Sequence, residues 1–190
     1  MQRNRDRAFS YIELLASIAS LAIILAASLP GWQQNLSGHR LARAAEDLAQ
    51  DLRSARNLSL THNKVYFVHY DNSTHHGGSG LDAASWCTLR STQTNCHCLA
   101  PNPAAACLEP AGNDIQRVDS HDHPGIHLVE ARFGGQNYTR FDPARGTARF
   151  GRLRLQDDFQ RSLQINVSLL GRVRICRPAG TISTGSYAAC

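Results

Sequence analysis

The chain has 190 residues, of which 42% are hydrophobic, and a formal net charge of +5. This length leaves room for one globular domain of about 130 residues beyond an N-terminal helical stalk, which excludes a protein of several domains. The charge is uneven: residues 65–131 carry seven acids and two Arg, whereas residues 132–178 carry ten Arg and three Asp. The basic character therefore belongs to the C-terminal third. Arg suits bidentate contact with phosphate, although a G+C-rich genome also favours Arg over Lys.

The first predicted element, residues 9–29, reads FSYIELLASIASLAIILAASL and is nearly all apolar. As a helix it spans about 30 Å, enough to cross the hydrocarbon core of a membrane. Arg3, Arg5 and Arg7 precede it, and positive charge keeps that end of a membrane helix in the cytoplasm. The sequence therefore predicts that everything after Leu29 is exported.

Glu13 is the one charged residue in this apolar stretch. A charge costs about 2.5–3.5 kcal/mol at the centre of a membrane helix and less near an end, so Glu13 needs an explanation. Three interpretations compete. The stretch is a cleaved signal peptide with a small-residue exit at residues 26–28, a plain membrane anchor that tolerates Glu13, or a segment in which Glu13 has a function.

Residues 8–13, AFSYIE, resemble the class III signal of type IV pilins and pseudopilins, in which a basic leader is cut just before a Phe and a Glu stands fifth in the mature chain. Glu13 is fifth counting from Phe9, and Pro30 falls where many pilins have a helix-weakening proline. Ala8 departs from the family, which usually has Gly before the cut. The resemblance implies cleavage and N-methylation at Ala8 and Phe9 by a prepilin peptidase. It also implies that Glu13 neutralises the amino terminus of a neighbouring subunit in a filament.

After Pro30 and Gly31 the pattern resumes as a second helical segment. Apolar residues recur at alternating spacings of four and three, and polar residues occupy the other faces. This pattern predicts an amphipathic helix packed against a sheet. The apolar positions are Leu41, Ala45, Leu48, Leu52 and Ala55.

The remainder of the chain reads as short β-branched and aromatic runs between polar, Gly-rich turns. We expect a loop over residues 71–80 and a long surface loop over residues 91–113. The predicted fold class is α+β: a long N-terminal helix, half membrane stalk and half amphipathic, packed on an antiparallel β-sheet. The predicted strands are 64–70, 85–90, 115–118, 126–133, 138–141, 147–155, 162–169 and 172–177.

Six cysteines lie beyond the apolar segment, on the oxidising side of a membrane by the topology above, so disulfides are expected. Cys176 and Cys190 are predicted to close the C-terminal tail into a loop. The other four lie within one loop-like stretch, and three pairings among them stay open. They are Cys87, Cys96, Cys98 and Cys107.

The segments FDPARGTARFG and RSLQINVSLLGRVRICRP, within residues 140–178, resemble the C-terminal half of the GspH/FimT group of minor pilins. With the N-terminal signal, this resemblance implies a pilin-like fold. In the FimT branch a G-R-x-R segment is associated with binding double-stranded DNA during natural transformation, and the match falls on Arg172 and Arg174.

The segment Gly171-Arg172-Val173-Arg174 has a physical basis for such a role. Residues two apart in a strand face the same side, so both guanidinium groups project together while Val173 points to the core. The candidate DNA-binding set also includes Arg177, and Arg152 and Arg154 on another strand. The alternative is the solvated edge of a basic protein, with Gly171 present only for a turn.

Metal and enzyme chemistry find little support in the sequence. The cysteines lack the paired C-x-x-C spacing of zinc ribbons, and His121, His123 and His127 surround a Pro-Gly turn without an H-E-x-x-H helix. There is no phosphate loop, paired-carboxylate signature or Ser/His/Asp order. We therefore expect no metal, no cofactor and no enzymatic activity, with a zinc enzyme as a distant alternative.

These expectations combine into one interpretation. Residues 1–8 form a cleaved leader, residues 9–29 a transmembrane and filament-core helix, and residues 30–190 an exported domain. The chain is held in the inner membrane with a periplasmic domain, then joins other major and minor pilins in a pilus at the cell surface, where it binds double-stranded DNA. The alternatives are a structural, tip-priming minor pilin of a twitching or adhesive pilus and a type II secretion pseudopilin, neither of which binds DNA.

The first prediction concerns processing. The precursor should be cut between Ala8 and Phe9, and Glu13→Ala should leave cutting intact while impairing incorporation into filaments. The intact mass of the mature protein tests the cut. A mature terminus beyond Leu25 would indicate an ordinary signal peptide and contradict the pilin interpretation.

Overall fold

The computed structural model describes residues 11–72, 85–98, 107, 116–181 and 186–190. Within them the chain forms one helix followed by eight strands, and it divides into two compact units, the first ending at Leu36 and the second running from Ser37 to Cys190. The predicted cleavage site at Ala8 and Phe9 lies outside the described residues. So do most of the predicted loop 71–80 and much of the loop 91–113.

Helix α1 spans Tyr11–His62 and runs through Pro30 and Gly31 without a break. A proline removes one backbone donor, and here the helix continues past it. In the first unit the large apolar side chains from Tyr11 to Leu25 are exposed. An 18-residue window of the helix has a mean hydropathy of 2.2, so among the described residues one helix is long and apolar enough to cross a membrane.

The helix ends in a left-handed cap. Asn63 has φ of 50°, and the amide of Lys64 donates to the carbonyl of Ser59 at 3.3 Å. This pattern satisfies a carbonyl that the last turn leaves unpaired, and Asn tolerates the left-handed conformation. The cap turns the chain from the helix into the first strand.

The strands pair in antiparallel fashion into two four-stranded sheets over the described residues, with orders β3-β2-β1-β5 and β4-β6-β7-β8. The predicted α+β class, a helix packed on antiparallel β-structure, is confirmed. The single predicted sheet is replaced by two, because β5 pairs with β1 while β4 pairs with β6. The strands are β1 Tyr66–Asn72, β2 Trp86–Ser91, β3 Gln116–Asp119, β4 Ile126–Arg132, β5 Tyr138–Phe141, β6 Gly151–Asp157, β7 Ser162–Val167 and β8 Val173–Cys176.

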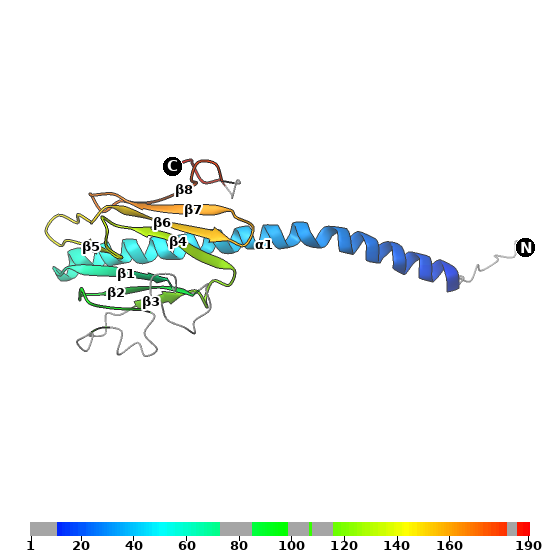
Figure 1. Cartoon of the computed structure of the whole chain (residues 1–190), viewed down its shortest axis with the longest axis horizontal. Helices are drawn as coiled ribbons and strands as arrows, with labels where there is room; N and C mark the ends of the chain where they lie inside the picture. Colours follow the sequence, from blue (N-terminus) through cyan, green and yellow to red (C-terminus); the bar gives the residue numbers. More distant parts are fainter. Residues whose placement is uncertain (1–10, 73–84, 99–106, 108–115, 182–185) are drawn as a thin grey trace, which may run out of the picture. The chain divides into compact units, whose positions relative to one another are not determined.

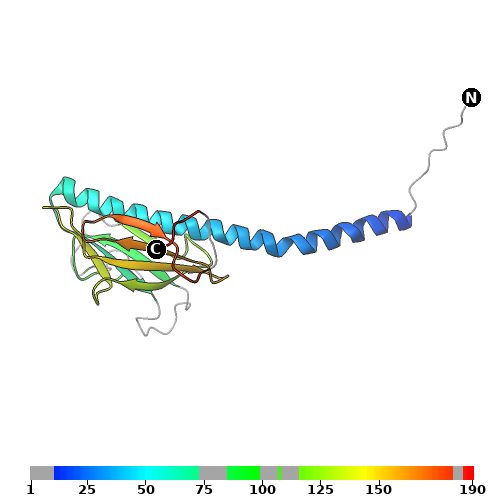
Figure 2. The ribbon, with the colours of Figure 1, turned by 90° about the horizontal axis from the view of Figure 1, so that it is seen from above.

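The part of α1 after Ser37 lies along one face of both sheets (Figures 1 and 2). Its buried side includes the five apolar positions that the spacing predicts, together with Ala44 and Ala49. Alanines bring the helix backbone close to the sheets, and Leu41, Leu48 and Leu52 fill the space between. These residues share one hydrophobic core with inward side chains of both sheets. Among the described residues, every buried residue of that core comes from Leu41 onward, so the unit Ser37–Cys190 has a core of its own.

The outward face of the first sheet carries a second, smaller core. Leu89 and Cys87 alternate along β2 with inward residues, and they pack with the cysteines of the segment that follows. The pairings are Cys87–Cys98 and Cys96–Cys107, and Cys176–Cys190 closes the C-terminal tail. Residues 92–98 and Cys107, which we call the cysteine-rich segment, therefore pack on this face of the sheet.

A buried ion pair lies between α1 and the first sheet. Arg90 donates to Asp51 at 2.9 Å and to the hydroxyl of Ser54 at 3.1 Å. Burial raises the pKa of Asp51 to about 6, although the charge and hydrogen bond of Arg90 act in the opposite direction. Such a pair contributes little net stability, but each partner needs the other because an unpaired charge in the core is costly.

The turn between β6 and β7 is held by the carboxylate of Asp157, which is buried. Its Oδ2 accepts from the hydroxyl of Ser37 and from Arg161 Nε, both at 2.8 Å, and from Arg161 Nη2 at 2.6 Å. Its Oδ1 accepts from the backbone amides of Phe159 at 3.1 Å and Arg161 at 2.8 Å. One side chain therefore orders the turn and ties it to α1.

Asp157→Ala should lower the free energy of unfolding by about 3–5 kcal/mol, because it removes a buried carboxylate that accepts from two backbone amides, the hydroxyl of Ser37 and the guanidinium of Arg161. Chemical denaturation of the unit Ser37–Cys190 measures this. Asp158→Ala is the matched control, since Asp158 is exposed and its bond to His127 at 2.9 Å is a surface contact worth about 0–1 kcal/mol. Equal losses in the two variants would contradict the role assigned to Asp157.

Candidate nucleic-acid interface

Strand β8 presents two arginines on one side. Arg172, just before the strand, and Arg174 within it are exposed, whereas Val173 is 8% exposed and faces the core. This alternation follows from the two-residue period of a strand. Both guanidinium groups therefore project from the outward face of the second sheet.

Gly171 sets the position of these arginines through the turn between β7 and β8. Its amide donates to the carbonyl of Ser168 at 2.9 Å, and the amide of Ser168 donates to the carbonyl of Arg172 at 3.0 Å. Gly171 has φ of 70°, and a Cβ there would lie 2.4 Å from the carbonyl oxygen of Gly146. Glycine is required both by the left-handed backbone and by this close approach.

The strand register places more arginines beside them. Arg174 is opposite Asn166 on β7, Asn166 is opposite Arg152 on β6, and Arg152 is opposite Arg132 on β4. Directly opposed residues point to the same face of a sheet, and neighbouring strands lie about 4.8 Å apart. Arg132, Arg152, Asn166 and Arg174 therefore form a row across the outward face, about 14 Å from end to end. We call it the arginine row.

Glu130 neutralises part of this face. It accepts from Arg152 at 2.7 Å and lies 3.5 Å from Arg154 and 3.7 Å from Arg132. Burial acts to raise the pKa of Glu130, but the hydrogen bond from Arg152 and the charges of the three arginines outweigh it and hold that pKa below its usual value. Arg152 and Arg154 are thus partly committed to Glu130.

The Arg172 end of the face is less neutralised. Arg172 and Arg174 line a surface hollow of about 670 Å³ together with Arg56, which reaches it from α1 and donates to the carbonyl of Gly146 at 3.2 Å. No ion pair to Arg172 or Arg174 occurs among the described residues. Three guanidinium groups therefore gather around this hollow.

Arg177 lies elsewhere. It follows the end of β8, its amide donates to the carbonyl of Ala188 at 2.8 Å, and its carbonyl accepts from the amide of Cys190 at 2.9 Å. The structure builds Arg177 into the disulfide-closed tail and does not bring it into the arginine row.

Two residues of the arginine row could not be predicted from the sequence. Arg132 and Asn166 belong to it only through the pairing of β4 with β6 and of β6 with β7. The alternation of Arg152 with Leu153 and Arg154 predicts a common face within one strand. This alternation does not indicate which residues of the neighbouring strands lie beside Arg152 and Arg154.

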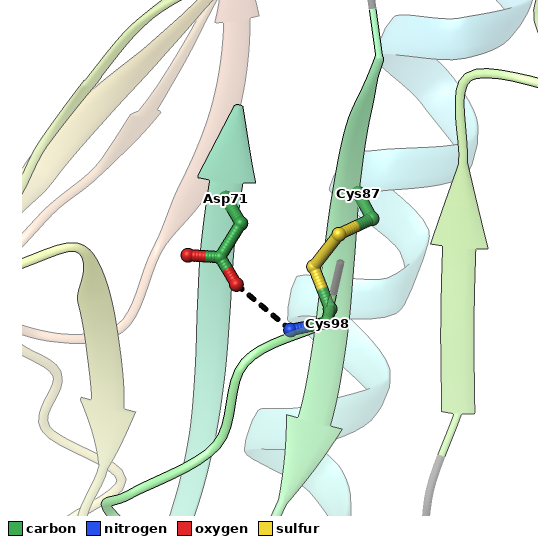
Figure 3. A group of neighbouring side chains, drawn as sticks. All are labelled: Asp71, Cys87 and Cys98. Carbon is green, nitrogen blue, oxygen red and sulfur yellow. Dashed lines mark hydrogen bonds between the residues drawn. A yellow bond between two sulfur atoms is a disulfide. The ribbon is translucent and has the colours of Figure 1, made fainter. Parts of the chain in front are cut away.

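One group of ligand-type side chains occurs among the described residues, formed by Asp71, Cys87 and Cys98. The two sulfur atoms are bonded to each other, and Asp71 Oδ2 accepts from the amide of Cys98 at 2.7 Å (Figure 3). A metal-binding cysteine is a thiolate, and bonded sulfurs cannot serve as one. The group therefore acts as a clamp that fastens the cysteine-rich segment to β1 and β2.

Comparison with protein families matches residues 44–171 to GspH, described as type II transport protein GspH. Among solved structures, the crystal structure of the type IV minor pilin FimU from Pseudomonas aeruginosa strain PAO1 is similar, with 11% sequence identity and a TM-score of 0.45. The similarity covers 78% of this chain and 92% of that one. Comparison with curated proteins gives no match. The family match spans about two thirds of the chain and ends directly before Arg172.

The charge balance of this face is testable with a simple polyanion. Glu130→Gln keeps the volume of the side chain but releases three arginines, so the protein should elute from immobilised heparin at higher salt than the parent. Glu46→Gln is the matched control, because it removes the same charge from α1, where Glu46 bonds to Tyr187. Equal shifts in the two variants would mean that net charge alone matters and would contradict a site at this face.

Proposed function

Because the chain belongs to the GspH family, we propose that it is a minor type IV pilin whose exported domain binds extracellular double-stranded DNA for natural transformation. The family supports a role as a type IV pilin or pseudopilin. DNA binding rests on the chain's own residues, since Arg172 and Arg174 lie beyond the matched segment.

The arginine row is the observation that carries this proposal. It spans about 14 Å, and duplex DNA carries one negative charge for about every 1.7 Å of its axis, so several phosphates lie within its reach. The outward face carries five arginines and the acid Glu130 among the described residues of its four strands and the β7–β8 turn. This face therefore has a net positive charge, which attracts a polyanion such as DNA.

The expected binding is weak and largely independent of sequence. Guanidinium groups on a sheet surface contact phosphates, which position a protein on DNA without reading its bases. Contacts of this kind give dissociation constants of about 10⁻⁴–10⁻⁶ M at physiological salt. Weak binding suffices if several copies share a filament, because linked sites raise the effective concentration.

The N-terminal unit supports the pilin part of the proposal. Its apolar helix fits anchoring in the inner membrane, and Glu13 lies in the first turn of α1. In this proposal a prepilin peptidase removes residues 1–8, residues 9–29 pass from the membrane into the filament core beside other major and minor pilins, and the domain that follows faces outward at the cell surface.

A second candidate follows from the family description. The description type II transport protein GspH favours a pseudopilin of a secretion system. In such a protein the arginines would be solvent-exposed residues without a DNA-binding role. A structural minor pilin without DNA binding shares that expectation. A test of DNA binding by the purified protein distinguishes these two candidates, which should not bind DNA, from the DNA-binding minor pilin.

Replacing both Arg172 and Arg174 by Gln should remove most duplex binding. It should also make the slope of log affinity against log salt shallower by about 1.8, because two phosphate contacts are lost. The melting temperature should hardly change, since exposed arginines contribute little to folding. Fluorescence anisotropy with a labelled blunt duplex, on the full chain in a non-ionic detergent, measures the affinity.

Arg140→Gln is the control for that experiment. Arg140 is exposed on β5 of the first sheet, where it is opposite Phe67 of β1. Its loss should therefore leave duplex binding by the second sheet almost intact. If the double variant binds as tightly as the parent at low salt, or loses binding only with loss of fold, the DNA-binding proposal fails.

A further inference from the structure

A second hollow, of about 630 Å³, lies at the opposite end of the arginine row. Arg132 and Arg152 line it together with Gln164, Asn166 and Phe150. The side-chain amide of Gln164 donates to that of Asn166 at 2.8 Å. This second hollow shares Asn166, Val167 and Ser168 with the hollow that holds Arg172 and Arg174. Both hollows therefore border the end of β7.

Phe150 is the unexpected member of this group. Its side chain is 63% exposed, whereas three of the other four phenylalanines in the described residues are buried. It precedes Gly151, where a Cβ would lie 2.2 Å from the carbonyl oxygen of Arg132. The glycine allows β4 and β6 to approach closely at this end. An isolated exposed aromatic residue is ordinary, but Phe150 lines the same hollow as Arg132 and Arg152.

This combination matches the chemistry of an unpaired nucleotide. An aromatic ring stacks on the face of a base, and guanidinium groups bind the phosphate. Inside a duplex the bases stack on each other and offer no free face to a side chain, and a blunt end offers only the outer face of a terminal pair. An unpaired nucleotide can instead turn its base out of the stack and into a hollow. The volume lies within the range of about 300–1,000 Å³ that small-molecule sites occupy.

We propose that this hollow binds an unpaired nucleotide at the end of a DNA duplex, with Phe150 stacking on its base and Arg132 and Arg152 binding its phosphate. The inference rests on the proposed function, because the duplex itself lies along the arginine row towards Arg174. It assigns Phe150, Arg132 and Arg152 to a strand-end subsite. The protein then holds DNA with a single-stranded end more tightly than blunt DNA.

The test compares two labelled probes on the full chain in non-ionic detergent: a blunt duplex, and the same duplex with a short oligothymidine overhang. The readout is the ratio of the two affinities. The parent should favour the overhang by about 5- to 100-fold, as expected for stacking of one base. Phe150→Ala should bring the ratio close to one.

Two further variants complete the test. Phe159→Ala, which removes an exposed ring from the β6–β7 turn, should keep the preference. Phe150→Trp should keep it as well, and the overhang should quench the tryptophan fluorescence of that variant while the blunt duplex does not.

Each outcome has a distinct meaning. If the parent binds both probes equally, or Phe150→Ala keeps the preference, the strand-end subsite is wrong while duplex binding stands. If neither probe binds the parent, the proposed function fails and this inference fails with it.

Discussion

The face of α1 between Leu41 and Ala55 is the constraint on which the rest of the domain depends. The inward side chains of both sheets share one core with this face. Among the described residues no strand pairing joins the two sheets to each other. The helix is therefore the surface that they share. Its small residues set how closely each sheet approaches, and the buried contacts of Asp51 with Arg90 and of Asp157 with Ser37 and Arg161 add polar links at two places.

Because α1 covers the inward faces, only the outward face of each sheet can bind another segment or a ligand. The two sheets differ in what their outward faces carry. The cysteine-rich segment packs on the outward face of the first sheet, held there by the Cys87–Cys98 disulfide and by Asp71. The second sheet presents arginines, amides and an exposed aromatic ring instead. The strands already fix the spacing of the residues in the arginine row. Binding a ligand there therefore costs little conformational entropy of the backbone.

The sequence predicts the elements well because they depend on local periodicity. The spacing of Leu41, Leu48 and Leu52 and the alternation of Arg172, Val173 and Arg174 are each visible within one segment. The arginine row, its neutralisation by Glu130 and the choice among three disulfide pairings depend on which distant strands and loops meet. That is decided by packing of the whole chain, which sequence patterns do not encode. The single predicted sheet became two for the same reason.

The central claim is that the outward face of β4, β6, β7 and β8 is the surface that meets DNA. Amide chemical-shift mapping by NMR on the unit Ser37–Cys190, titrated with a short blunt duplex, tests it most directly. The account predicts that the largest shifts fall on Arg152, Asn166, Arg172 and Arg174 and disappear at high salt. Shifts concentrated on the cysteine-rich segment or on β1 and β5, or no shifts at all, would contradict it.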